Sequence, residues 1–137
     1  MIDFADAAPG RFCWADLATH DAARAANFYA RAFGWTARRA RAGGGEIVRL
    51  ALGGRDVASL YQLNGELRAR GVPSHWTAYL RVADADAAVL RVAASGGRLV
   101  VAPFDASEDA RVALVEDATG ALLGLWQSTV MPGDGVR

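Results

Sequence analysis

The chain repeats itself, and this repeat restricts the possible folds more than any other feature of the sequence. The first half contains W-A-D-L-A-T-H-D-A-A-R-A-A-N-F-Y-A-R-A-F-G-W (14–35), and the second contains T-A-Y-L-R-V-A-D-A-D-A-A-V-L-R-V-A-A-S-G-G-R (77–98). An offset of 63, from 14 to 77, superposes leucine, aspartate and glycine positions. Later, A-S-L-Y-Q (58–62) and L-G-L-W-Q (123–127) correspond at an offset of 65. Such self-similarity predicts two copies of one structural module.

Each half predicts the same order of elements: one strand, one helix and three further strands. The first strands are expected at 11–17 and 75–82, and the helices at about 21–33 and about 84–95. The change of offset predicts two additional residues in a loop of the second half, at 105–109. The further strands are expected at about 35–40, 46–52, 56–63, 98–102, 110–116 and 121–128.

Residues suited to helix ends lie at the predicted boundaries. Asp21 or Thr19 in the first half, and Asp84 in the second, are placed to cap the helix starts. Gly34 and the pair Gly96–Gly97 lie where a helix end requires a left-handed residue. Both halves therefore give the pattern βαβββ.

The length of the chain predicts one domain over residues 1–137. Within it we expect a first module at about 10–63, a linker at 64–74, a second module at about 75–128 and a loose tail at 129–137. The linker and the tail are rich in glycine, proline and polar residues, which is typical of connecting and terminal segments.

Composition excludes several classes of partner. Fifteen basic residues balance fifteen acidic ones, so no charge field favours binding to nucleic acid or to an anionic membrane. The start, M-I-D-F-A-D-A-A-P-G, lacks the basic and apolar regions of a signal peptide, and no apolar run approaches the ~20 residues of a membrane span. With one cysteine, Cys13, no internal disulfide is possible. A cytoplasmic location is expected.

Strand alternation separates two kinds of side chain. One register is apolar and suited to packing under the helices: Ala15, Leu17, Ala58, Leu60, Ala78, Leu80, Leu123 and Leu125. The other register mixes aromatic and polar groups: Phe12, Trp14, Asp16, Ser59, Tyr61, Thr77, Tyr79, Arg81, Gly124 and Trp126. Aromatic walls with a few polar groups are typical of a small-molecule pocket. Alternatively, the aromatics fill a core between sheet halves or at a subunit interface.

These segments resemble the vicinal oxygen chelate superfamily, which includes glyoxalase I, bleomycin-resistance proteins and extradiol dioxygenases. The spaced F-Y and F-G-W of the first half and V-E-D-A-T-G-A-L-L-G-L-W-Q of the second carry the resemblance over about residues 10–128, and a glyoxalase-like subgroup fits best. Ala118 departs from the proline usual in the final turn. The resemblance implies an α+β fold of two tandem βαβββ modules, forming a curved eight-stranded cupped sheet with helices on its convex side.

The family's metal enzymes carry His, Glu or Gln ligands at four strand positions. By spacing, the resemblance places these positions at Trp14, Ser59, Thr77 and Gly124. Divalent metals bind imidazole, carboxylate, thiolate or carbonyl oxygen, whereas indole is a donor only, glycine has no side chain and neutral hydroxyls bind weakly. His20 and His75 lie outside this register. We therefore expect neither a metal nor another cofactor.

Candidate acid–base residues remain on the same face. Asp16 is placed to accept a hydrogen bond or act as a base, unless it pairs with Arg81 or Arg49, and Tyr79 is the second candidate. Cys13 falls in the register that faces the helix, which predicts a buried, inert thiol rather than a nucleophile.

Two functions are compatible with this pattern. The first is a metal-free protein that binds an aromatic or otherwise flat small molecule in the concave cup. The second is an enzyme of lyase, isomerase, hydroxylase or dioxygenase type, using an atypical metal site or metal-free acid–base residues. A purely structural or protein-interaction module explains the composition of the concave face less well. Exposed sheet edges also predict a homodimer.

Overall fold

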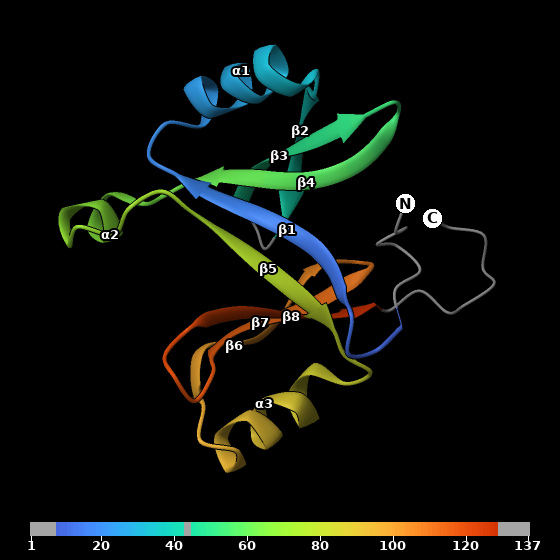
Figure 1. The fold of residues 1–137 in the computed structure, drawn as a ribbon, viewed down its shortest axis with the longest axis vertical. Coiled ribbons are helices and arrows are strands. Elements are labelled where there is room, and N and C mark those ends of the chain that lie inside the picture. The colour runs from blue at the N-terminus through green and yellow to red at the C-terminus, as the bar shows by residue number, and fades with distance from the viewer. Residues whose placement is uncertain (1–7, 43–44, 129–137) are drawn as a thin grey trace. The chain divides into compact units, whose positions relative to one another are not determined.

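The computed structural model describes residues 8–42 and 45–128, which contain eight strands and three helices. They divide into two compact units: the first unit is residues 15–77, and the second unit is 1–14 together with 78–137. The chain passes from one unit to the other within a strand each time (Figure 1). In the described part, no helix combines the length and the apolar character needed to cross a bilayer.

The first unit holds a four-stranded arrangement in the order β2-β3-β4-β1. The strands β1 and β4 run parallel, whereas β2–β3 and β3–β4 are antiparallel. A short helix, α2, follows the last of these strands. The elements are β1 (Phe12–Thr19), α1 (Ala22–Phe33), β2 (Thr36–Ala42), β3 (Gly45–Leu52), β4 (Arg55–Gln62) and α2 (Gly65–Ala69).

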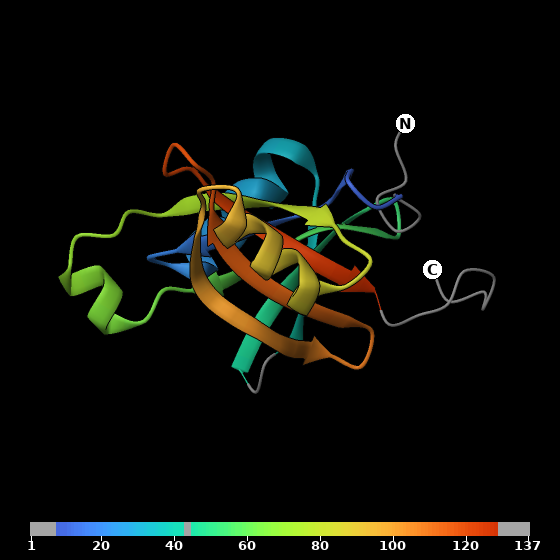
Figure 2. The same cartoon turned by 90° about the horizontal axis from the view of Figure 1, so that it is seen from below.

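The second unit repeats this order as β5-β8-β7-β6, again with the first and last strands of the module parallel. In Figure 2 the helix α3 lies across the strands of its own module. Both modules are therefore βαβββ, which confirms the α+β fold class with two tandem modules. The elements are β5 (His75–Arg81), α3 (Ala85–Ala94), β6 (Arg98–Ser107), β7 (Ala110–Glu116) and β8 (Leu122–Ser128).

Each module packs its helix on the apolar register of its own strands. Under α1, Leu17, Leu50, Ala58 and Leu60 form a buried cluster with the inner side chains of the helix. Full burial of one leucine contributes about 1.5–3 kcal/mol.

Under α3, the buried cluster is Ala88, Ala113, Val115 and Leu125, with Leu80 and Leu123 packed against it. In both modules the predicted helix-facing leucines are therefore in place.

The helix boundaries follow local hydrogen-bond chemistry. Asp21 Oδ1 accepts from Arg24 N at 3.0 Å, so the cap of α1 is Asp21. Asp84 caps α3 in the same way. Gly34 (φ 75°) ends α1 in the left-handed conformation that was predicted for it.

Two connections differ from the sequence-based expectation. The strand β6 continues to Ser107 instead of ending near 102, because irregularities in its pairing with β7 absorb the additional residues that were expected in a loop. The linker contains the helix α2, whose first turn is capped by Asn64 through a bond from Leu67 N at 2.8 Å. The predicted tail at 129–137 lies outside the described residues.

Candidate functional site

Three aromatic side chains of the second unit form what we call the aromatic wall: Trp14, Tyr79 and Trp126. The centroids of the Trp14 and Trp126 rings are 5.8 Å apart at an interplanar angle of 38°. The ring of Tyr79 meets Trp126 edge-on, at 6.0 Å and 87°. Since neighbouring residues of β5 and β8 pack under α3, strand alternation places Tyr79 and Trp126 on the opposite face of the sheet.

The aromatic wall covers the backbone of Gly124. This glycine is the register partner of Tyr79 on the parallel strands β5 and β8. A Cβ atom at position 124 would lie 2.3–2.6 Å from carbon atoms of the Tyr79 ring, closer than real Cβ contacts come. The tyrosine therefore fills the space in which any side chain of residue 124 would begin.

The first unit carries a different chemistry on its corresponding face, which we call the polar row: Asp16, Ser59, Arg49 and Arg38. Successive members are register partners on the neighbouring strands β1, β4, β3 and β2. Ser59 Oγ donates to Asp16 Oδ1 at 3.0 Å. Asp56 Oδ2 lies 2.8 Å from Arg38 Nη2 and 3.9 Å from Arg49 Nη1.

Burial changes the acid–base character of the residues near the polar row. Ser59 is 7% exposed, whereas Asp16 is half-buried. Burial raises the pKa of Tyr61 above its ordinary value, and the negative charge of Asp16 raises it further. Tyr61 therefore stays protonated at neutral pH and presents a hydroxyl donor near the carboxylate.

Cys13 is buried as predicted, but in a different environment. It packs with Tyr79, Ala110 and Val112 beside the aromatic wall and not under a helix, so the predicted orientation is wrong. The physical reason is that the start of β1 belongs to the second unit, where its neighbours come from another module. Burial raises the pKa of the Cys13 thiol to about 11, against a smaller opposite effect of Arg81.

The remaining predicted site residues are less closely grouped. Phe12 is 53% exposed. Thr77, in the first unit, is 7% exposed. Arg81, in the second unit, is half-buried and close enough to influence Cys13 electrostatically, and its backbone N–H donates to Arg11 O at 2.8 Å. The structure thus groups the wall with Gly124 in one unit, and Asp16 with Ser59 and Tyr61 in the other.

The four positions implied by the family resemblance do not fit a divalent metal. Trp14 is part of the aromatic wall, and Gly124 lies under a tyrosine ring. The Ser59 hydroxyl donates a hydrogen bond to the carboxylate of Asp16, and Thr77 is a buried neutral hydroxyl. Among the residues that the structure describes, no group of three or more His, Cys, Asp or Glu could hold a metal ion.

Two glutamines that the sequence did not single out support both modules. Gln62 Oε1 accepts from Ala22 N at 2.9 Å, and Gln127 Oε1 accepts from Ala85 N at 2.8 Å. Each glutamine ends the repeated stretches A-S-L-Y-Q and L-G-L-W-Q and binds the first helical N–H of its own module. The shared final Gln was the signal that could have revealed this role.

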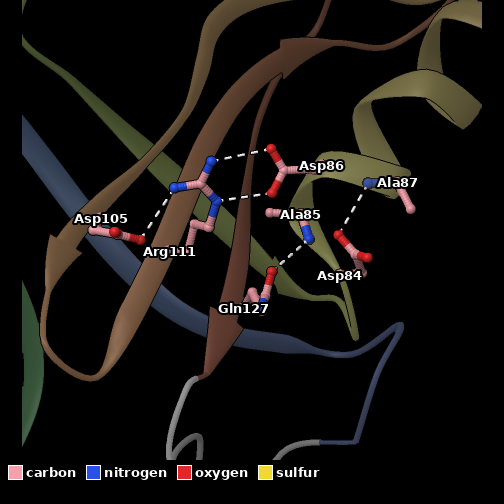
Figure 3. Close-up of polar contacts among 7 residues, drawn as sticks. All are labelled: Asp84, Ala85, Asp86, Ala87, Asp105, Arg111 and Gln127. Atoms are coloured by element: carbon pink, nitrogen blue, oxygen red, sulfur yellow. Dashed lines mark hydrogen bonds and ion pairs between the residues drawn. The ribbon is translucent and has the colours of Figure 1, made fainter.

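The start of α3 is also fixed by an arginine, as Figure 3 shows. Arg111, on β7, donates from Nε and Nη2 to the two carboxylate oxygens of Asp86 at 2.8 and 3.0 Å. Its Nη1 donates to Asp105 Oδ1 on β6 at 3.1 Å. These hydrogen bonds lower the pKa of Asp86 and join the helix to two strands.

A cavity of about 430 Å³ lies in the first unit between α1 and strands β2 to β4. Its helix side is formed by Ala22, Ala23 and Ala26, and none of the 12 residues of α1 is fully buried. The short alanine side chains leave this space unfilled. Its volume is typical of ligand sites. The lining includes the predicted site residue Tyr61 and Arg38 of the polar row, but neither the aromatic wall nor Asp16.

A comparison with known families assigns the chain. The model of the Glyoxalase/Bleomycin resistance protein/Dioxygenase superfamily matches residues 11–125. The chain belongs to this superfamily. The match confirms the resemblance seen in the sequence and covers nearly all of both modules.

Curated relatives of this superfamily member include two bacterial proteins. "Putative glyoxylase CFP32" of Mycobacterium tuberculosis is 35% identical over 125 residues, which cover 84% of this chain and 44% of that protein. "Anthracycline biosynthesis protein DnrV" of Streptomyces peucetius is 34% identical, over 92% of this chain and 50% of that protein. The chain thus spans about half the length of the curated relatives it matches.

Solved structures of methylmalonyl-CoA epimerases share the superfamily fold. One, in complex with methylmalonyl-CoA and NH4+, has a TM-score of 0.63 at 19% identity, covering 90% of this chain and 97% of that one. The epimerase of Mycobacterium tuberculosis has a TM-score of 0.62 at 21% identity, covering 95% and 94%. At this identity the likeness establishes the fold alone.

Proposed function

We propose that this superfamily member binds a flat, aromatic small molecule against the aromatic wall, without the metal used by other members. The observation that carries the proposal is the pair Tyr79 and Gly124. At position 124, which the family resemblance assigns to a metal ligand, this chain has a hydrogen atom covered by an aromatic ring. A ligand would therefore meet aromatic rings at this surface, and not side chains that bind a metal ion.

The aromatic wall contains partly exposed rings and one buried ring, and we assign them different roles. Trp14 and Trp126 are partly exposed and would stack on the ligand, whereas Tyr79, 8% exposed, holds Trp126 from behind. Each aromatic pair contributes about 0.5–1.5 kcal/mol beyond the burial of area. Arg81, the charged residue of the predicted ligand-binding set in the same unit, would orient a polar substituent of the ligand.

The names of two relatives support an aromatic ligand. DnrV and DauV are both named as anthracycline biosynthesis proteins, and anthracyclines contain fused planar rings. An extended planar ligand matches the stacking surface of Trp14 and Trp126. Because this chain spans about half of each relative, we carry over only the class of ligand and not a reaction.

Binding of 9,10-anthraquinone, measured by titration calorimetry, tests the proposal. Trp126→Ala is expected to weaken binding about tenfold, since it removes a ring that contacts two other rings. Trp35→Phe, at an aromatic residue near α1, is the matched control and should leave affinity unchanged. Unchanged affinity in both Trp126→Ala and Trp14→Ala would contradict the proposal. So would one tightly held equivalent of Fe, Zn, Mn or Ni in the purified protein.

A metal-free isomerase or lyase is the second candidate function, and the Ser59–Asp16 hydrogen bond favours it. The bond at 3.0 Å fixes the orientation of a half-buried carboxylate, as a general base requires. Tyr61 supplies a neutral hydroxyl nearby. Tyr79 is less suited to proton transfer because it is buried in the wall. Exchange of substrate carbon-bound hydrogen for solvent deuterium, abolished by Asp16→Asn, would establish this activity.

We further propose that the protein is a cytoplasmic homodimer. The end strand β6 leaves apolar side chains exposed, among them Leu99, Val100 and Phe104. Exposed strand edges of this kind favour association. Sedimentation as a single species near 14.4 kDa, the mass of one chain, would contradict the dimer.

A further inference from the structure

The cavity of about 430 Å³ lies wholly in the first unit, on the face of the sheet that α1 covers. All of its lining residues fall between positions 22 and 62, which belong to that unit. Leu60, Val48 and Arg39 are successive register partners on β4, β3 and β2, and all three line the cavity. Because Leu60 packs in the core under α1, strand pairing places the other two side chains on the same face.

Exposure rises along this row of three side chains from the core to the end of the sheet. Leu60 is 0% exposed, Val48 is half-buried and the side chain of Arg39 is 87% exposed. The strand β2, which carries Arg39, is the first in the order of the sheet and so has a neighbour on one side only. The row therefore leads from an apolar interior to a guanidinium in water across two strand spacings, about 10 Å.

The second unit fills the equivalent space between its helix and its strands. The repeat offset of 63 relates Ala26 of α1 to Val89 of α3, which packs against the core of its own module. The same offset relates Ala23 to Asp86, which binds Arg111 of β7 and so ties α3 to the sheet. The helix α3 buries two of its residues, whereas α1 buries none. The βαβββ module therefore folds with this space filled, and the fold does not require the cavity under α1.

The charges at the exposed end of the row favour an anion. Arg39 Nε lies 3.7 Å from Glu46 Oε1, which is longer than a charge-assisted hydrogen bond, so the guanidinium keeps N–H donors for a ligand. Glu46 is the register partner of Arg41 on β2, so this acid lies beside two arginines. Arg38, also in the lining, pairs with Asp56 at 2.8 Å. An anionic group at Arg39 would therefore meet more positive than negative charge.

We propose that the cavity binds a free carboxylic acid with an unbranched aliphatic chain of medium length. The chain lies between α1 and the sheet, over Val48 and Leu60, and the carboxylate pairs with Arg39. Alanine methyl groups of α1 and aliphatic side chains of the strands form the walls, which suit a hydrocarbon chain. Because the lining includes no member of the aromatic wall, this second site is independent of the proposed function.

Two probes with the same chain and opposite charges, octanoate and octylammonium, test the role of Arg39. In titration calorimetry at low ionic strength, octanoate should bind the full chain about fivefold more tightly than octylammonium, since an exposed ion pair makes a modest contribution. Arg39→Met should remove this preference by weakening the binding of octanoate, and about 0.5 M NaCl should do the same to the wild type. Glu46→Gln removes the competing acid and should strengthen octanoate binding about twofold. Arg31→Met, at an exposed arginine in the last turn of α1, is the matched control and should change neither affinity.

Ala26→Leu tests the place of the aliphatic chain. The larger side chain occupies the cavity, so octanoate should bind about tenfold more weakly, while thermal unfolding reports whether the variant is folded. Trp126→Ala, in the aromatic wall, should leave the affinity for octanoate unchanged.

Three results would overturn the inference and leave the proposed function standing. They are the absence of octanoate binding, octylammonium bound as tightly as octanoate, and an octanoate affinity that survives Ala26→Leu. If Ala26→Leu does not fold, the exposed substitution Arg39→Met decides: an unchanged octanoate affinity in that variant overturns the inference, and a loss of about fivefold supports it.

Discussion

The ring of Tyr79 lies against the backbone of Gly124, its register partner on the neighbouring parallel strand. The Tyr79 ring fits at this place only because residue 124 has no Cβ atom. The ring in turn shields the Gly124 backbone from water. In the other module the equivalent pair is Asp16 and Ser59, joined by a hydrogen bond of 3.0 Å. One pair of sheet positions thus supports both an aromatic surface and a polar one.

The contact between Tyr79 and Gly124 predicts that Gly124→Ala destabilises the protein. The added Cβ would lie 2.3 Å from a ring carbon, which forces the ring or the strand to move. Overpacking of this kind costs about 1–3 kcal/mol in the free energy of unfolding, which urea denaturation measures. Gly65→Ala is the control, because an added Cβ there meets no described atom within 4 Å. Its effect should stay within about 0.5 kcal/mol.

A double variant separates this steric cause from a general effect on β8. Tyr79→Ala creates space over residue 124, so Gly124→Ala should cost less in the Tyr79→Ala background than in the wild type. Equal costs in the two backgrounds would show that the ring is not the source of the strain.

The hydrogen bonds of Gln62 and Gln127 predict a second effect on stability, which differs between the two residues. Gln127→Ala removes the acceptor for Ala85 N and should lower the free energy of unfolding by about 0.5–2 kcal/mol, as the loss of a helix cap does. Gln127→Glu keeps an oxygen acceptor at a helix N-terminus and should be tolerated. Gln62→Glu should be worse, because the Gln62 amide also donates to His20 O. Thermal unfolding of the three variants would reveal whether this order holds.

Strand alternation and caps explain why much of the fold was predictable. A period of two fixes the face on which Leu17, Leu60 and Leu125 lie, and their burial under the helices followed directly. Asp21 and Asp84 fixed the helix starts through local bonds only. These features depend on residues close in sequence or on regular geometry.

The predictions that failed depended on partners from elsewhere in the chain. Alternation assigned a face to Cys13 but not the residues that pack on it, which come from β5 and β7. The continuation of β6 to Ser107 depends on irregular pairing with β7, which no single-strand pattern contains. Likewise, the bond between Ser59 and Asp16 follows from the register of β1 against β4. Pairing register is a tertiary property, so the polar row emerged only with the structure.

The buried thiol of Cys13 predicts a loss of stability at high pH. Its pKa is raised from 9.0 to about 11, so the protonated thiol is favoured in the folded state. The associated stability is complete below pH 9 and is lost as the pH rises through 11. Cys13→Ala should therefore show a smaller decrease in urea midpoint between pH 8 and pH 10.5 than the wild type. Rapid alkylation of the folded protein by iodoacetamide at pH 8 would contradict the burial of this thiol.

The bridge between Arg111 and Asp86 at the start of α3 predicts a change in the pKa of Asp86 when the arginine is replaced. Hydrogen bonds from Arg111 hold the pKa of Asp86 below its ordinary value of 3.8. Arg111→Met should therefore raise the pKa of Asp86 toward 3.8, as followed by carbon-detected NMR titration.

A carboxyl group whose pKa is lowered in the folded state stabilises the protein at pH values above its ordinary pKa, and this stabilisation is lost as the pH falls. The wild type should therefore lose more stability than the Arg111→Met variant below pH 4. Both residues of the bridge lie at the surface, so this difference should be small and should shrink further in salt. Arg98→Met is the control: it breaks the pair with Glu116 at 2.9 Å and should leave the titration of Asp86 unchanged. If Asp86 titrates identically in the wild type and in Arg111→Met, the bridge between α3 and β7 does not form in solution.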